Sequence, residues 1–598
     1  MNIITILVPA LLLYALAHRF YAPRLARAFG EDDARMTPAL ARNDGVDYVP
    51  TRPHVLFAHH FSAIAAAGPI VGPTLALLYG YGPAFLWIIV GAILIGAVHD
   101  YACLFVSMRE GGRSIAEIAR TTVGPAAFFL LALFIIFNLA VVNAVFIHLT
   151  AVSLTSLRTP AELGLPADQT IFRTITEGGI EKAVVGGIAS SSAIALTVIA
   201  PILGYFVVKR GMRNRYAYPL ATALCLGSVL VGFALPVAIP TIEFGAFRID
   251  PTHTWVILIS FYVLFAAAVP VWLILQPREF VSVQFLYLGI ALLVTALIGA
   301  GLRGVPLQAP GMNIEAGGHS MGALWPTLFV TIACGAVSGF HGLVASGTTS
   351  KQVTKESHAR HVGYLGMLGE SALALCVTLT VGAGMLFSDY LPLVVKPEGA
   401  GPDWKQNPVL AFSVGVAGIC ELGLGIPRWM GLVFGLLMVE GFVLDTLDVA
   451  IRLNRYLLEE VWAMLFRRVP RFLKNYWTNS GIAVALMLAF AFGDTRNQLW
   501  PIFGTGNQLL ASLSLMTIAL WMYKHGRPVG YVLIPALLVG ATTVSALIYL
   551  FTMRYLPTGK VLLATMAAVF FVLAMGYAAL TVRAAMKVRT QRVNANLE

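Results

Sequence analysis

The chain has 598 residues, of which 58% are hydrophobic and only 12% are charged. A typical soluble domain has about 25% charged residues, so this composition excludes a soluble globular protein and indicates a chain that folds in lipid. The formal net charge of +11 does not indicate nucleic-acid binding, because the basic residues fall in short loops between apolar runs, where they report topology. We therefore expect a lipid bilayer around the chain and no nucleic-acid partner.

The N-terminal apolar run, residues 2–18, has no basic segment before it and no convincing cleavage site after it. It is therefore interpreted as a retained membrane helix and not as a signal peptide. Residues 1–54 are then an N-terminal helix followed by a cytoplasmic loop. The five cysteines form no CxxC pair, so we expect small packing residues and no disulfide framework.

Apolar runs of about 20 residues, each long enough to cross a bilayer, recur along the whole chain. They predict an all-α polytopic membrane protein with about 15 transmembrane helices. The expected ranges are 2–18, 55–79, 83–107, 123–152, 187–208, 217–239, 254–276, 281–300, 321–347, 362–387, 429–451, 478–493, 497–523, 529–551 and 560–582.

Most of the 40 lysine and arginine residues lie in alternate loops, which the positive-inside rule places in the cytoplasm. The N-terminus is then outside and the C-terminus inside, which requires an odd number of spans. A further apolar run, 407–425, is interpreted as an outer-side or re-entrant helix, because one more span there would put the later basic loops outside.

The spans within 55–239 and those within 254–451 form two consecutive blocks that run in opposite senses. This parity is typical of inverted-repeat secondary transporters. Residues 55–451 are therefore the expected transport core, and residues 452–598 are a C-terminal membrane region of four helices.

Helix-breaking residues occur in the first span of each block. The stretch HHFSAIAAAGPIVGP contains two Gly-Pro pairs, and the span 254–276 contains Val269-Pro270 and ends at Gln276-Pro277. Interrupted helices at matching positions point to a substrate site, although proline and glycine are also simply common in membrane helices. The N-terminus of a half-helix suits a small carboxylate. The expected substrate-binding residues are Gly68, Pro69, Gly72, Pro73, Pro270, Trp272 and Ser338.

Ionisable side chains within the spans are functional candidates, and here they share one layer in the inner half of the membrane. The layer comprises His59, His60, His99, Asp100, His341 and Glu370, with Asp445 and Asp448 at the end of a later span. Three interpretations stay open: proton coupling, a buried hydrogen-bond network, and a zinc or iron site. The metal ligands would be His59, His60, His99, Asp100 and His341.

Two further features qualify this layer. Asp448 precedes Arg452 by four residues, which predicts an ion pair within one helix. Ser346, Thr348 and Thr349 follow in the segment SGFHGLVASGTTSK, where hydroxyls and freed carbonyls could bind a sodium ion; helix packing and a helix cap explain the same residues equally well.

Several of these stretches together resemble the carbon starvation protein (CstA) family. They are GVDYVPT, HHFSAIAAAGPIVGP, VPVWLILQPREF, TIACGAVSGFHGLVASGTTSK, LWPIFGTGNQLLA and LDTLDVAIRLNRY, within about residues 35 to 525. The resemblance implies a bacterial inner-membrane transporter with a five-plus-five inverted-repeat core of the LeuT/APC type, with extra N- and C-terminal helices. Relatives of this family transport pyruvate, with proton coupling, or are linked to peptide uptake.

The predicted function is therefore secondary active import of a small carboxylate, pyruvate first, by proton or cation symport, and not an enzyme activity. A peptide importer of the same family is the alternative within this class. A membrane metalloprotein with a histidine-based site is the alternative of another class. No Walker A motif supports an ATP-driven pump, and the sequence leaves monomer and homo-oligomer both open.

Overall fold

The computed structural model describes every residue of the chain except 1, 46, 66, 167, 178, 245–246, 271–272, 400–403, 493–498 and 596–598. Helices dominate the described residues, and the strands there are short and few. All five cysteines are buried and free, as expected. The predicted all-α membrane fold is confirmed.

Within the described residues, twelve helices are long and apolar enough to cross a membrane, and one bent pair, Pro53–Ile64 with Gly68–Tyr79, makes a thirteenth span if counted as one. Two predicted spans are shorter than a full crossing. The range 478–493 is the helix α21 (Tyr476–Ala491), and the range 321–347 is divided between α15 (Leu324–Thr331) and α16 (Gly339–Gly347). The extra apolar run is a helix of 17 residues, α19 (Pro408–Leu424).

The chain forms two compact units, and each is assembled from three stretches of sequence. The first unit contains residues 1–6, 139–311 and 376–499. The second unit contains residues 7–138, 312–375 and 500–598. Because the stretches alternate along the chain, residues far apart in sequence meet within each unit.

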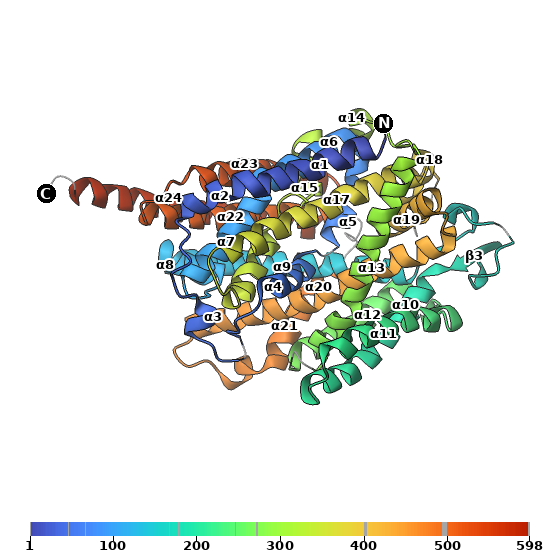
Figure 1. Cartoon of the computed structure of the whole chain (residues 1–598), viewed down its shortest axis with the longest axis horizontal. Coiled ribbons are helices and arrows are strands. Elements are labelled where there is room, and N and C mark those ends of the chain that lie inside the picture. The colour runs from blue at the N-terminus through green and yellow to red at the C-terminus, as the bar shows by residue number, and fades with distance from the viewer. Residues whose placement is uncertain are drawn as a thin grey trace. The chain divides into compact units, whose positions relative to one another are not determined.

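The first unit is a helical bundle with two small β-structures. Its elements are the end of α9 (Pro125–Leu154), then β1 (Leu157–Arg158), β2 (Thr174–Glu177), β3 (Ile180–Val184), α10 (Val185–Gly204), α11 (Asn214–Ala234), β4 (Ile242–Phe244), β5 (Phe247–Ile249), α12 (Pro251–Ala268), α13 (Leu275–Leu302), the end of α17 (Leu365–Gly384), α18 (Phe387–Val394), α19, α20 (Arg428–Leu465) and α21. In Figure 1, α10 runs beside α11, and these two helices contact each other along their length.

Small residues let the helices of the first unit approach closely. A Cβ atom built on Gly415 would lie 3.0 Å from the Cα atom of Val381, so the end of α17 and α19 meet backbone to backbone. Gly431 makes the same kind of approach from α20 to Ala417. The strands form a sheet in the order β1-β3-β2, with Thr174 opposite Ala183, and a separate antiparallel pair β4-β5.

The second unit contains both of the interrupted helices described below. Its elements are α1 (Ile4–Leu16), α2 (Ala22–Phe29), α3 (Pro38–Ala41), α4 (Pro53–Ile64), α5 (Gly68–Ala76), α6 (Tyr81–Gly91), α7 (Ala97–Arg109), α8 (Ile115–Thr122), the start of α9, α14 (Ile314–Met321), α15, α16, the start of α17, α22 (Leu499–Lys524), α23 (Gly530–Tyr549) and α24 (Val561–Ala595). A π-helix, Ala92–Gly96, joins α6 to α7, and the three segments form one candidate membrane span, Tyr81–Arg109.

Candidate functional site

The first interruption separates α4 from α5, where the helix axis turns by 50°. It falls at the first Gly-Pro pair, as the sequence predicts. Pro69 occupies the first turn of α5, where the missing backbone N–H costs no helical hydrogen bond. Every residue of α5 is buried, so the restarted half-helix lies inside the unit and not at its surface.

The second interruption separates α15 from α16 and leaves residues 332–338 outside any helix. The carbonyl oxygens of Phe329 and Ile332 accept hydrogen bonds from the Trp87 indole, at 3.1 and 3.2 Å, and from the side-chain amide of Gln508. The Oδ1 atom of Asn507 accepts from the backbone N–H of Phe340, at 2.9 Å, and so caps the start of α16. Side chains therefore replace the lost helical bonds, as burial in a membrane protein requires.

The two interruptions pack directly against each other. A Cβ atom on Gly68 would lie 2.4 Å from the Sγ atom of Cys334, and one on Gly72 would lie 2.6 Å from the carbonyl oxygen of Thr331. Both distances are far below van der Waals contact, so only glycine fits at these two positions. The Gly-Pro pairs thus serve close helix approach as well as the break itself.

A buried chain of acid and imidazole groups begins beside this contact. Each carboxylate oxygen of Asp100 lies 2.8 Å from the Nδ1 atom of a histidine, Oδ1 from that of His99 and Oδ2 from that of His341. The Nε2 atom of His341 then lies 3.0 Å from an oxygen of Glu370. All four side chains have no solvent exposure, so this polar group is sealed within the unit.

The two ends of the acid–imidazole chain differ in their contacts. At one end, the Nε2 atom of His99 lies 3.4 Å from the thiol of Cys103. At the other end, His341 and Glu370 are within ion-pair distance, but the atoms are not aligned as a hydrogen bond. Neither carboxylate oxygen of Glu370 has a hydrogen-bond partner among the described residues. The Glu370 end is therefore the unsatisfied one.

The adjacent residues His59 and His60 of the predicted layer lie in different surroundings. His60 is buried, and its Nδ1 atom lies 2.9 Å from the hydroxyl of Thr349. His59 is exposed, so the structure does not bring it into the buried chain. The two neighbours point to different faces of α4, as neighbouring helical residues do.

The hydroxyls of the predicted sodium site are engaged in separate bonds. Ser346 donates to the carbonyl oxygen of Gly342 at 2.7 Å, and Thr348 donates to that of Val344 at 3.1 Å. Thr348 is exposed, whereas Thr349 is buried beside His60. Among the described residues, no hydrogen bond joins these three hydroxyls to one another, and the sodium site stays a prediction.

The expected interruption of span 254–276 is corrected by the structure. The helix α12 ends at Ala268 and α13 begins at Leu275, so Pro270 lies in a linker between two full-length helices. Pro277 lies in the first turn of α13, where it does not break the helix. The second interrupted span is therefore the α15/α16 pair. Trp272 lies outside the described residues.

Ser338, the last of the expected substrate residues, does lie at an interruption. It precedes α16 and its hydroxyl accepts a hydrogen bond from the side-chain amide of Asn507 at 3.0 Å. Gly68, Pro69, Gly72 and Pro73 are all in α5, against the same segment. All five residues belong to the second unit, whereas Pro270 belongs to the first.

A second buried charged cluster lies in the first unit, and the sequence pointed to its Asp445 and Asp448 but not to Arg278. The Nη1 atom of Arg278 lies 3.0 Å from an oxygen of Asp445 and 3.0 Å from an oxygen of Asp448, and Tyr262 donates to Asp448 at 2.7 Å. The predicted pair between Asp448 and Arg452 is wrong. Arg452 donates instead to two backbone carbonyl oxygens at the end of α12.

The side chains with the spacing of a metal site are not those predicted. Among the described residues, one set of three qualifies: ligand atoms of Cys334, His341 and Glu370 all lie within 4.8 Å of one another. Only His341 belongs to the predicted metal set. The Nδ1 atom of His99 is turned to Asp100, and His60 is turned to Thr349.

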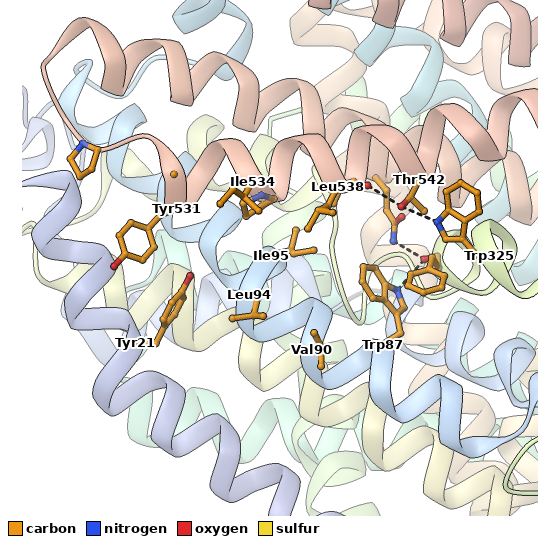
Figure 2. Close-up of a pocket in the computed structure, with 16 residues that line it drawn as sticks. Tyr21, Trp87, Val90, Leu94, Ile95, Trp325, Tyr531, Ile534, Leu538 and Thr542 are labelled. Atoms are coloured by element: carbon orange, nitrogen blue, oxygen red, sulfur yellow. Dashed lines mark hydrogen bonds between the residues drawn. The ribbon is translucent and has the colours of Figure 1, made fainter.

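An apolar cavity of about 700 Å³ lies in the second unit, behind the second interruption. Figure 2 shows Trp87, Val90 and Ile95 of one helical segment facing Ile534 and Leu538 of α23 across it. The indole of Trp87, which holds the freed carbonyl oxygens, forms part of its wall. None of the acid and imidazole groups lines this cavity, so it is a separate feature from the polar chain.

The interrupted helices and the intramembrane acid–imidazole chain define a class, the multi-pass α-helical proteins built like secondary transporters. A sequence model described as "Carbon starvation protein CstA" matches residues 2–398 and 402–546, and the chain belongs to this family.

Similar proteins have transporter names. "Peptide transporter CstA" of Bacillus subtilis (strain 168) is 30% identical over 89% of this chain and 87% of its own. "Pyruvate/proton symporter BtsT" of Escherichia coli (strain K12) is 30% identical over 89% of this chain and 79% of its own. Among solved structures, MhsT in complex with L-phenylalanine covers 87% of this chain and 98% of its own, with 13% identity and a TM-score of 0.46.

The chain is accordingly a multi-pass membrane transporter and not an enzyme. Its relatives are named for peptide or pyruvate transport.

Proposed function

We propose that the chain imports a small carboxylate, pyruvate first, across the bacterial inner membrane by symport with a proton. The observation that supports coupling to protons is the 3.0 Å contact between His341 and Glu370, at the unsatisfied end of the buried chain. A relative named as a pyruvate/proton symporter supports both the substrate and the ion.

The argument for a proton is one of counting hydrogens. With Asp100 ionised, its oxygens can only accept, so the Nδ1 atoms of His99 and His341 must both carry hydrogen. The Nε2 atom of His341 would then present a lone pair to Glu370, and an ionised Glu370 would present another. One proton between these two atoms removes the conflict, whichever atom holds it. Without this proton, the Glu370 carboxylate would be a second buried negative charge, beside that of Asp100, with no positive charge to compensate it.

The site proposed for the substrate lies where the two interruptions meet. Residues there are Gly68, Pro69, Gly72 and Pro73 of α5, together with Ser338 before α16. The start of α5 presents the positive end of a helix dipole, which favours a carboxylate. The contact of Gly68 with Cys334 places this helix start next to the end of the polar chain. Pro270, in the first unit, and Trp272, outside the described residues, stay predictions from the sequence alone.

The size of the site supports a small substrate over a peptide. Every residue of α5 is buried, and the interruption is packed by Cys334 and by backbone. A peptide importer remains the second candidate because several relatives carry that name. Sodium in place of the proton is a further variant of the proposal, through Ser346, Thr348 and Thr349.

The proposal extends to architecture and orientation. We place the N-terminus outside and the C-terminus in the cytoplasm, from the distribution of basic residues. The transport core is proposed within residues 55–451, with α4/α5 and α15/α16 as the interrupted helices. We place the chain in the inner membrane, which the bacterial source of its relatives supports.

The test is uptake of labelled pyruvate into proteoliposomes with and without an inward pH gradient. The proposal predicts accumulation that requires the gradient and that excess unlabelled pyruvate suppresses. Di- and tripeptides as competitors, and a sodium gradient in place of the pH gradient, test the alternatives in the same assay. Uptake that ignores both the pH gradient and unlabelled pyruvate would contradict the proposal.

A further inference from the structure

We propose that Cys334, His341 and Glu370 form a binding site for a transition-metal ion of the zinc type. This inference goes beyond the proposed function, because metal binding requires no statement about the transported substrate. It rests on three observations: the chemistry and spacing of the ligand atoms, the groups behind them, and the unpartnered atoms among them.

The three ligands have the chemistry of a zinc site. A thiolate, an imidazole and a carboxylate are the groups that bind zinc in proteins, and three of them leave a fourth position open. Their ligand atoms already lie within 4.8 Å of one another, and all three residues are buried. Bond lengths of about 2.0 to 2.3 Å to a shared ion would require these side chains to close by roughly an ångström.

Groups behind two of the ligands hold them in the orientation that a metal needs. The Nδ1 atom of His341 is bound by Asp100 at 2.8 Å, so the Nε2 atom is directed toward Glu370 and Cys334. A carboxylate behind a histidine is the usual arrangement at protein metal sites. The side-chain amide of Asn507 donates to the Sγ atom of Cys334 at 3.4 Å and so favours the thiolate.

The buried atoms that lack a hydrogen bond provide the second observation. The Nε2 atom of His341 and both carboxylate oxygens of Glu370 are buried and have no hydrogen-bond partner among the described residues. A buried polar atom without a partner requires an explanation, and a bound ion is one of those that apply in proteins. Here three such atoms lie together, beside a thiol.

The ligands come from three different parts of the second unit. Cys334 lies in the non-helical segment, His341 in α16 and Glu370 in α17. An ion bound by all three would tie the second interruption to a neighbouring helix and, through the Cys334–Gly68 contact, to the first. The ion would also occupy the atoms proposed to hold the proton. We therefore expect the metal-loaded protein not to transport, and this last expectation rests on the proposed function.

The test uses purified full-length protein equilibrated with Co²⁺ as a spectroscopic substitute for Zn²⁺, and then with Zn²⁺ itself. One bound ion per chain is expected, with a thiolate-to-cobalt charge-transfer band that Zn²⁺ abolishes. Cys334→Ser is expected to remove the band and to weaken the affinity by more than about tenfold, since losses outside the ligand shell alone cost about that much. Cys376→Ser, in a buried cysteine of the same helix as Glu370, is the matched control and is expected to keep both.

Metal stoichiometry and the charge-transfer band are measured without reference to transport. Wild-type protein with neither bound metal nor a thiolate band would overturn the site, and so would metal that persists unchanged in Cys334→Ser. Pyruvate uptake measured in Cys334→Ser, with and without added Zn²⁺, then tests the link to function. Uptake by the variant that Zn²⁺ no longer inhibits supports the expectation that the bound metal stops transport. Equal block of the variant and the wild type would contradict it without affecting the symport proposal.

Discussion

The Nε2 atom of His341 lies 3.0 Å from a carboxylate oxygen of Glu370, and both side chains are fully buried. The first is on a helix that restarts after an interruption, and the second is on the helix packed beside that interruption. An ion-pair contact at this place connects the protonation state of Glu370 to the geometry of the break. The first prediction tests this connection directly.

Glu370→Gln is expected to abolish pyruvate accumulation driven by a pH gradient, because an amide cannot share the proton with His341. Exchange of labelled for unlabelled pyruvate, which requires no net proton movement, is expected to persist. Both are measured in proteoliposomes. Glu421→Gln, at a half-exposed glutamate paired with Arg428, is the control and should behave as wild type. Loss of accumulation and exchange together would mean that Glu370 serves folding or substrate binding.

Gly68→Ala is expected to destabilise the protein by about 1–3 kcal/mol, because the new Cβ atom would overlap Cys334 and force the two interruptions apart. The midpoint of thermal unfolding in detergent measures this. Gly481→Ala is the control, since its Cβ atom would meet nothing within 4 Å. It should leave the midpoint unchanged or raise it. Equal midpoints for Gly68→Ala and wild type would contradict the close contact.

Arg278→Met is expected to destabilise the protein by about 3–5 kcal/mol, because it leaves Asp445 and Asp448 buried without their cation. A double-mutant cycle with Asp448→Asn should give a coupling energy between Arg278 and Asp448 of at least about 1 kcal/mol.

The control cycle uses Arg452→Met with Asp448→Asn. Because Arg452 bonds to backbone carbonyl oxygens, its coupling to Asp448 should be close to zero. A larger coupling for Arg452 than for Arg278 would restore the pairing that the sequence suggests.

Thr349→Val is expected to cost about 1–3 kcal/mol, because the buried Nδ1 atom of His60 loses its 2.9 Å partner. The exposed neighbour gives the control: Thr348→Val removes a hydroxyl that bonds only locally to Val344, and should change stability by less. Unfolding midpoints compare the two. If sodium binding required both hydroxyls, both variants would instead lose a sodium-dependent uptake.

The membrane helices and the first interruption are predictable from the sequence because each has a local cause. Apolar runs must match the bilayer, and Pro69 favours the first turn of a helix and so marks where α5 restarts, whereas Pro73 lies inside α5 without ending it. His99, Asp100, His341 and Glu370 were also identified, since ionisable residues in a span are conspicuous. Contacts join these four side chains in one buried group, whereas His59 lies on the exposed side of α4.

The second interruption was not predictable from local sequence, because residues 332–338 contain no proline. The break is stabilised by distant side chains, Trp87 and Gln508, which hold the freed carbonyl oxygens. Gly335, Ser338 and Gly339 are the only local signal, and small residues also occur in unbroken packed helices.

The pairing of Arg278 was missed for a related reason. Arg278 and Asp448 are separated by 170 positions. The rule that oppositely charged residues four apart in a helix form an ion pair therefore predicted Arg452 as the partner of Asp448. In the structure, Asp448 pairs with the distant Arg278.

The most direct test of the central claim is proton movement driven by pyruvate alone. Proteoliposomes with a trapped pH indicator and no initial pH gradient are given an inward pyruvate gradient, with wild-type protein and with Glu370→Gln. We predict acidification of the lumen by the wild type and none above the protein-free background by the variant. Pyruvate entry by the wild type without acidification beyond that background would contradict proton symport.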